Sequence, residues 1–164
     1  MRRGALFIAP LVVLLLAACG SSGGSNSTTT QQPRLSAAAY GNRITQIGKE
    51  ASAAQALVAK GLHAKTVAEL SQRVGRFAAD TQRIGDEVAK LNPPKNAEAA
   101  NTQLAQGLHD IATATKAASV KLAKMKTVQA AVQYLEHSSA AQKGSNEVTG
   151  ALTTLDQLGY SGGS

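Results

Sequence analysis

The stretch TVAELSQRVGRFAADTQRIGDEVAKLNPP, residues 66–94, decides the fold class. Side chains recur in it at alternating spacings of three and four residues, and one threonine is the only polar member: Val67, Leu70, Val74, Phe77, Thr81, Ile84, Val88 and Leu91. This spacing places them on one face of an α-helix. Thr66 and Glu69 match a capping box at the start, and the Pro-Pro pair ends the segment because proline cannot continue the helical hydrogen bonds. We predict a helix over about residues 66–91.

Similar patterns predict further helices on both sides of this segment. A weaker stripe predicts a helix over about residues 36–60, which Gly61 would end. After the prolines, a second regular stripe predicts a helix over about 94–125: Leu104, Leu108, Ile111, Thr115, Ala118, Leu122 and Met125. A less regular segment predicts a fourth helix over about 127–158. Its middle, HSSAAQKGSN at 137–146, has no large apolar residue, and the phase of the pattern slips there.

The boundary between the third and fourth helices rests on a short repeat. Lys-Thr-Val occurs at residues 65–67 and again at 126–128, and in both places the threonine stands where an N-cap would begin a helix. The repeat favours a turn near Thr127 and two helical hairpins. The alternative is one long helix over 94–143, because neither glycine nor proline separates the two segments.

Together these segments predict an all-α fold, an antiparallel four-helix bundle of two helical hairpins formed by residues 35–160. Narrow apolar stripes need partner helices to be buried, and four helices around one core satisfy that need. The regular spacing also suits a coiled-coil dimer, so both a monomer and a homodimer remain open. Residues 161–164 are expected to form a disordered tail.

The N-terminus has the pattern of an export signal. Two arginines precede the fourteen-residue apolar run ALFIAPLVVLLLAA, which is short for a membrane-spanning helix. Leu16-Ala17-Ala18-Cys19 at its end resembles the lipobox of bacterial lipoproteins. The resemblance implies that residues 1–18 are a signal peptide, cleaved before Cys19, and that the Cys19 thiol carries a diacylglycerol. Since Cys19 is the only cysteine, attachment of lipid also accounts for an otherwise unpaired thiol in an exported protein.

Residues 19–34 are expected to link this anchor to the helices as a flexible tether. The sequence GSSGGSNSTTTQQP has almost nothing to bury, and chains of this composition remain disordered. The fifteen residues from Gly20 to Arg34 have a typical reach of ~20–23 Å. The expected location is the cell membrane, on its extracytoplasmic side.

Composition and motifs argue against several function classes. The net charge is +7, but aromatic residues make up 3% and tryptophan is absent, so we expect no nucleic-acid partner. No nucleophile, phosphate-loop or paired-carboxylate motif occurs. His63, His109 and His137 lack metal-ligand spacing and are expected at the surface. We therefore predict a non-enzymatic protein without a metal or cofactor, unless these histidines converge with acidic residues.

Two groups of polar residues are candidate sites. Counting along equal helices puts Thr81 level with Gln142, and Thr115 level with Ser138 or Ser139, which predicts a polar layer across the middle of the bundle. This layer would either fix helix register or enclose a small ligand cavity. The second group lies near the end of the third helix. It would either interact favourably with the negative end of the helix dipole or contact anionic lipids or polymers. Its members are Lys116, Lys121, Lys124 and Lys126.

Residues 90–111, KLNPPKNAEAANTQLAQGLHDI, resemble a segment of small uncharacterised lipoproteins and secreted helical proteins of actinobacteria. This resemblance implies a location in the cell envelope and no particular activity. The expected function is that of a membrane-anchored envelope lipoprotein, a helical module acting through contacts with an unknown envelope protein. The alternative is an envelope protein that binds a small or amphipathic ligand within the helical bundle.

Overall fold

A computed structural model describes residues 33–61 and 63–160, without the side chains of 57–61. The chain divides into two units, Met1–Gln31 and Gln32–Ser164, and all described residues belong to the second. The predicted signal peptide (1–18), Cys19, most of the tether (19–34) and the tail (161–164) lie outside the described residues.

The described residues are all-α, which confirms the predicted fold class. They form five α-helices and one short 3₁₀ helix, and none of them lies in a strand. The elements are α1 (Ala37–Gly61), α2 (Val67–Ala89), η1 (Lys95–Ala97), α3 (Glu98–Leu122), α4 (Val128–Glu136) and α5 (Gln142–Gln157). No helix within residues 33–160 combines the length and apolar character needed to cross a membrane.

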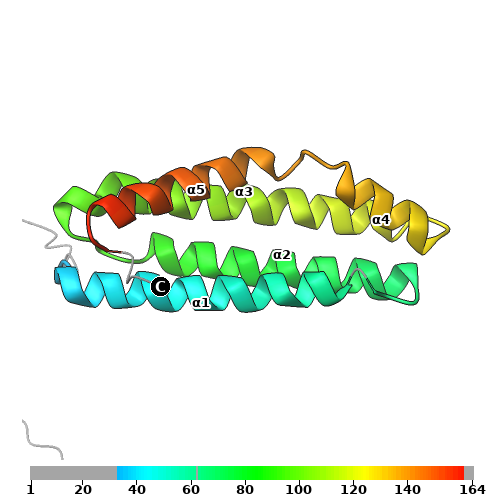
Figure 1. Cartoon of the computed structure of the whole chain (residues 1–164), viewed down its shortest axis with the longest axis horizontal. Coiled ribbons are helices and arrows are strands. Elements are labelled where there is room, and N and C mark those ends of the chain that lie inside the picture. Colours follow the sequence, from blue (N-terminus) through cyan, green and yellow to red (C-terminus); the bar gives the residue numbers. More distant parts are fainter. Residues whose placement is uncertain (1–32, 62, 161–164) are drawn as a thin grey trace, which may run out of the picture. The chain divides into compact units, whose positions relative to one another are not determined.

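Helices α2 and α3 form an antiparallel hairpin in the centre of this unit. Helix α1 packs on α2, and α5 packs on α3 (Figure 1). One end of the bundle, here called the corner end, holds the start of α1, the α2–α3 corner at residues 90–97 and the end of α5. The opposite end, here called the far end, consists of residues 63–76 and 116–137, and it includes the α1–α2 turn, the end of α3 and all of α4.

Two threonines set the helix starts at the far end. The Thr66 hydroxyl accepts a hydrogen bond from the Glu69 backbone N–H at 3.1 Å, and Thr127 accepts one from Ala130 N–H at 3.2 Å. Each bond satisfies a backbone donor that has no partner within its own helix. The turn predicted near Thr127 is therefore confirmed, and the alternative of one long helix over 94–143 is wrong.

The predicted fourth helix over 127–158 is also wrong, because it is two helices. Helix α4 ends at Glu136 and α5 begins at Gln142. The connecting residues are small and polar, so a continuous helix would have no large side chain to bury there. Helix α5 turns Ala151, Leu155 and the partly buried Val148 toward the core. Ala151 and Leu155 are buried, whereas Leu152 is 40% exposed.

A pair of glycines lets α3 and α5 pack backbone against backbone. A Cβ atom on Gly107 would lie 2.8 Å from the Gly144 carbonyl oxygen, and a Cβ on Gly144 would lie 2.6 Å from the Gly107 carbonyl oxygen. Both distances are shorter than a carbon–oxygen contact allows. Only glycine at both positions therefore permits this approach, which fixes where α5 crosses α3.

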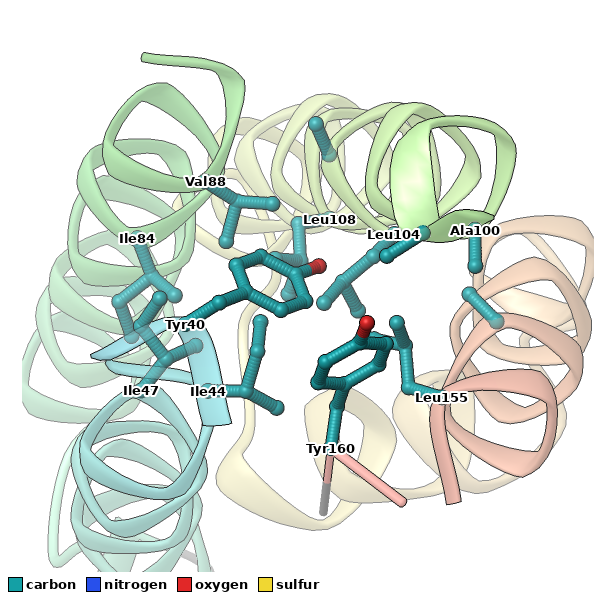
Figure 2. Packing of buried hydrophobic residues seen from close by; sticks show 13 residues of the cluster. Tyr40, Ile44, Ile47, Ile84, Val88, Ala100, Leu104, Leu108, Leu155 and Tyr160 are labelled. Carbon is teal, nitrogen blue, oxygen red and sulfur yellow. The ribbon is translucent and has the colours of Figure 1, made fainter. Parts of the chain in front are cut away.

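The apolar core consists of two clusters along the bundle. The larger one lies toward the corner end, where Leu104 and Leu108 of α3 and Leu155 of α5 surround the rings of Tyr40 and Tyr160 (Figure 2). The smaller one lies at the far end and contains Ala64, Leu70, Val74, Leu122 and Ala131. The far end is therefore held together by packing of its own, in addition to the helix hairpin.

Candidate functional site

The far end brings three chain segments together around Leu122. Ala64 from the α1–α2 turn and Ala131 from α4 belong to the same buried cluster as Leu122, the last residue of α3. The two Lys-Thr-Val segments consequently lie at the same end of the bundle. Lys65 joins the lysines of the second repeat in space, although 61 residues separate Lys65 from Lys126.

Positive charge is concentrated at this far end. Residues 63–76 and 116–137 contain seven basic and two acidic side chains, an excess of five positive charges. The other residues with described side chains contain seven basic and eight acidic groups, an excess of one negative charge. The bundle is therefore electrically asymmetric along its axis.

Basic side chains form more ion pairs outside the far end than within it. Outside the far end, ion pairs join Arg34 to Glu98, Arg43 to Glu87, Arg83 to Glu50 and Glu87, and Lys143 to Asp110 and Glu147. At the far end Arg73 pairs with Glu69. Within the part of the chain that the structure describes, the remaining far-end cations form no ion pair: Lys65, Arg76, Lys116, Lys121, Lys124 and Lys126.

All four lysines predicted as a surface contact are exposed. Lys121 lies with its Nζ 5.8 Å from the centre of the Tyr134 ring, a cation–π distance. Lys116 and Lys121 belong to α3, whereas Lys124 and Lys126 lie in the turn before α4. The structure adds Lys65 and Arg76 to this group, which sequence proximity alone did not reveal.

A second candidate site is a groove of about 930 Å³ along the outer face of α2 and α3. Its lining includes the buried alanines Ala78 and Ala112, and Val120, which is 55% exposed. Arg83 and Lys116 also border the groove. Small residues keep the surface hollow here, because their side chains do not fill the space between the two helices.

The predicted mid-bundle polar layer does not form between Thr81 and Gln142. Thr81 is buried and Thr115 is half-buried, but Ser139 and Gln142 are exposed. The Gln142 amide donates to Asn146 on its own helix at 3.0 Å instead of pointing inward. The physical reason is the break between α4 and α5, which shifts the register on which the prediction depended.

A small cavity near this break brings together Thr115 and Ser138, which the count along the helices had put level. It has a volume of about 110 Å³ and is lined by Thr115 and Ser138, together with several alanines. Thr81 and Gln142 do not line it. The prediction of a cavity shared by these two residues is therefore wrong.

A buried polar cluster at the corner end was missed by sequence reasoning. The Tyr40 hydroxyl donates to Asn101 Oδ1 at 3.0 Å, and the Asn101 amide donates to the Val88 carbonyl at 3.1 Å. The Tyr160 hydroxyl donates to Asn96 Oδ1 at 2.8 Å. Burial, with a smaller contribution from Tyr160, raises the pKa of Tyr40 to about 12. This cluster connects three helices to the last of the described residues.

The histidines do not converge. His63 and His137 are exposed, as predicted, whereas His109 is half-buried with its Nε2 3.0 Å from Asp86 Oδ1. The His109 side chain is still 30% exposed, so all three histidines reach the surface. Within the described residues, no group of three or more His, Cys, Asp or Glu side chains is arranged to hold a metal ion.

Comparison with known proteins found no match: no family model, no curated protein and no solved structure is similar to this chain.

Proposed function

We propose that this protein is a membrane-anchored lipoprotein of the cell envelope, a non-enzymatic helical module that acts through protein contacts on the extracytoplasmic side. The observation that carries the proposal is the position of Cys19, directly after an apolar run and before a Gly/Ser/Thr-rich segment. In this proposal residues 1–18 are a signal peptide, Cys19 carries the lipid, and residues 20–34 tether the helical bundle to the membrane.

The corner end is where such a tether would meet the bundle. The Arg34 guanidinium donates to the Pro93 carbonyl at 3.0 Å and pairs with Glu98, and Leu35 N–H donates to the Asn92 carbonyl at 2.8 Å. These contacts hold the first described residues against the α2–α3 corner. In the proposal, the corner end faces the membrane.

The far end is consequently the part presented to other envelope components. Helix α3 has 25 residues and a length of ~37 Å, at 1.5 Å per residue. A bundle tethered at its corner end can therefore present the far end well beyond the lipid headgroups. This geometry supports a module that reaches from the membrane toward a partner.

The lead proposal is tested by following lipid attachment and location together. Wild-type protein and Cys19→Ala are expressed in a bacterium that processes lipoproteins, with an alkyne-labelled fatty acid in the medium. We expect label and membrane association for the wild type and neither for Cys19→Ala. An unlabelled wild-type protein in the soluble fraction would contradict the proposal.

The groove between α2 and α3 favours a second candidate, an envelope protein that binds a small or amphipathic ligand. Its volume of about 930 Å³ is in the range of ligand sites, which are commonly ~300–1,000 Å³. The site would lie on the outer face of the hairpin, whereas the sequence had suggested the bundle interior. Native mass spectrometry of the unit formed by residues 32–164 tests it. A retained small molecule supports the candidate, and a bare mass equal to the denatured mass contradicts it.

A further inference from the structure

We propose that the far end binds a flexible polymer that carries repeated phosphate groups. Six cations without an ion pair are displayed there from three segments that one buried cluster holds together: Lys65, Arg76, Lys116, Lys121, Lys124 and Lys126. Unpaired cations close together repel one another, and a polyanion relieves that repulsion while releasing its own counterions.

The helix dipoles explain only part of this arrangement. A lysine stabilises a helix when it lies near the C-terminus, where the dipole is negative. Lys121, in the last turn of α3, satisfies that condition. Lys65 and Lys126, however, directly precede the N-caps of α2 and α4, where the dipole is positive and a cation is unfavourable. Their positions therefore call for a different explanation.

The residue types favour a polymer over a folded protein as the ligand of the far end, so the protein contacts of the proposed function would lie on other faces of the bundle. The cores of protein–protein interfaces are depleted in lysine and enriched in aromatic residues, methionine and arginine. Five of the six far-end cations are lysines. Lysine acts as a mobile point charge that binds phosphate without the fixed two-point geometry of arginine. Mobile charges on an exposed surface suit a partner that is itself flexible and repetitive.

The choice of a polymer over the lipid surface rests on the proposed anchor at Cys19. With the tether entering at the corner end, the far end is ~37 Å away along α3. Electrostatic attraction to the membrane decays over ~8–10 Å at physiological salt. An upright bundle therefore presents these lysines to polymer outside the membrane, beyond the electrostatic reach of the headgroups.

The test uses the full protein as the cell produces it, purified in a zwitterionic detergent from whichever fraction contains it, with linear inorganic polyphosphate as the probe. The far-end variant combines Lys65→Gln, Lys124→Gln and Lys126→Gln. The matched control combines Lys49→Gln, Lys90→Gln and Lys95→Gln. These three lysines are also exposed, they form no ion pair among the described residues, and their replacement removes the same charge. Affinity is measured as a function of salt concentration, and circular dichroism verifies that both variants remain helical.

We expect the far-end variant to bind polyphosphate on the order of tenfold to a hundredfold more weakly than the wild type, and the control to change severalfold at most. The slope of log affinity against log salt should fall by about two for the far-end variant, since each lost phosphate contact removes ~0.7. Equal losses in both variants, or no binding by the wild type, would overturn the proposal.

Two further arms separate the alternative partners. Soluble poly-glutamate and vesicles of anionic phospholipid are titrated against the same three proteins, and vesicles of zwitterionic phospholipid give the binding by a lipid anchor alone, which is subtracted. If either competitor binds through the far-end lysines more tightly than polyphosphate does, the proposed partner is wrong. These assays are made in solution, so their outcome is independent of lipid at Cys19. The intact mass of the same preparation reports the anchor separately, and failure of one proposal is distinguishable from failure of the other.

Discussion

The Tyr40 hydroxyl donates a 3.0 Å hydrogen bond to Asn101 Oδ1, and through this bond α1 is joined to α3 inside the corner-end core. Asn101 in turn donates to the Val88 carbonyl at the end of α2. The edge of the Tyr40 ring also meets the Tyr160 ring, with centroids 5.1 Å apart. One buried asparagine and two tyrosines thus connect three helices with the end of the described chain.

Removal of the asparagine is expected to cost more than removal of the hydroxyl. Asn101→Ala deletes a buried side chain and leaves both the Tyr40 hydroxyl and the Val88 carbonyl without that partner, at a cost of ~2–4 kcal/mol. Tyr40→Phe loses one hydrogen bond and is expected to cost ~1–2 kcal/mol. Urea denaturation followed by circular dichroism measures both. A cost of Asn101→Ala below that of Tyr40→Phe would contradict this account of the cluster.

Stability is expected to fall steeply at alkaline pH because of Tyr40. Its pKa is about 12 in the folded protein, against ~10 in an unfolded chain. The neutral hydroxyl therefore favours folding fully below about pH 10, and this contribution is lost as the pH rises toward 12. The loss amounts to at most ~2.7 kcal/mol, at ~1.36 kcal/mol for each pKa unit. Tyr40→Phe should lack this component, so parallel stability curves of the two proteins between pH 9 and 12 would contradict the prediction.

The α3–α5 contact should be intolerant of a single methyl group. Gly107→Ala places Cβ 2.8 Å from the Gly144 carbonyl oxygen and 2.9 Å from Val148, so the helices must separate, at a cost of ~1–3 kcal/mol. Gly48→Ala is the matched control, since a Cβ at this α1 position meets no atom within 4 Å. It should instead stabilise the protein by ~0.5–1 kcal/mol through helix propensity. Thermal denaturation decides whether the two variants shift in opposite directions.

The helix positions could be predicted where the sequence encodes them locally. The three-and-four spacing of Leu70, Val74, Ile84 and Val88 corresponds to buried positions on α2, and Thr66 and Thr127 are N-caps. These features depend on residues only a few positions apart, so periodicity and cap chemistry suffice to find them.

The tertiary arrangement could not be predicted in the same way. Gly107 and Gly144 look unfavourable within helices until each is known to pack directly against the backbone of the other. Asn101 and Tyr40 are 61 residues apart, and no local sequence pattern near either residue predicts their contact. The only sequence signal of the break after Glu136 is the loss of the apolar pattern, because residues 137–141 contain neither glycine nor proline. Likewise, Lys65 lies near the other far-end lysines only because the α1–α2 turn and the α3–α4 turn lie at the same end of the bundle.

The proposed orientation predicts different depths for two surface positions. With the native cysteine occupied by lipid, Lys95→Cys at the corner end and Lys126→Cys at the far end can each be labelled with a single fluorophore. Nitroxide-labelled lipids should quench the probe at position 95 more strongly, because position 126 lies ~37 Å farther along the bundle. Equal quenching, or stronger quenching at position 126, would show that the bundle does not stand on its corner end.

Lipid anchoring at Cys19 is tested most directly by the mass of the N-terminal peptide of the mature protein isolated from bacterial membranes. We expect a chain that begins at Cys19 and carries a thioether-linked diacylglycerol. A peptide that begins before Cys19, or one with a free Cys19 thiol, would contradict the claim that this protein is a lipoprotein.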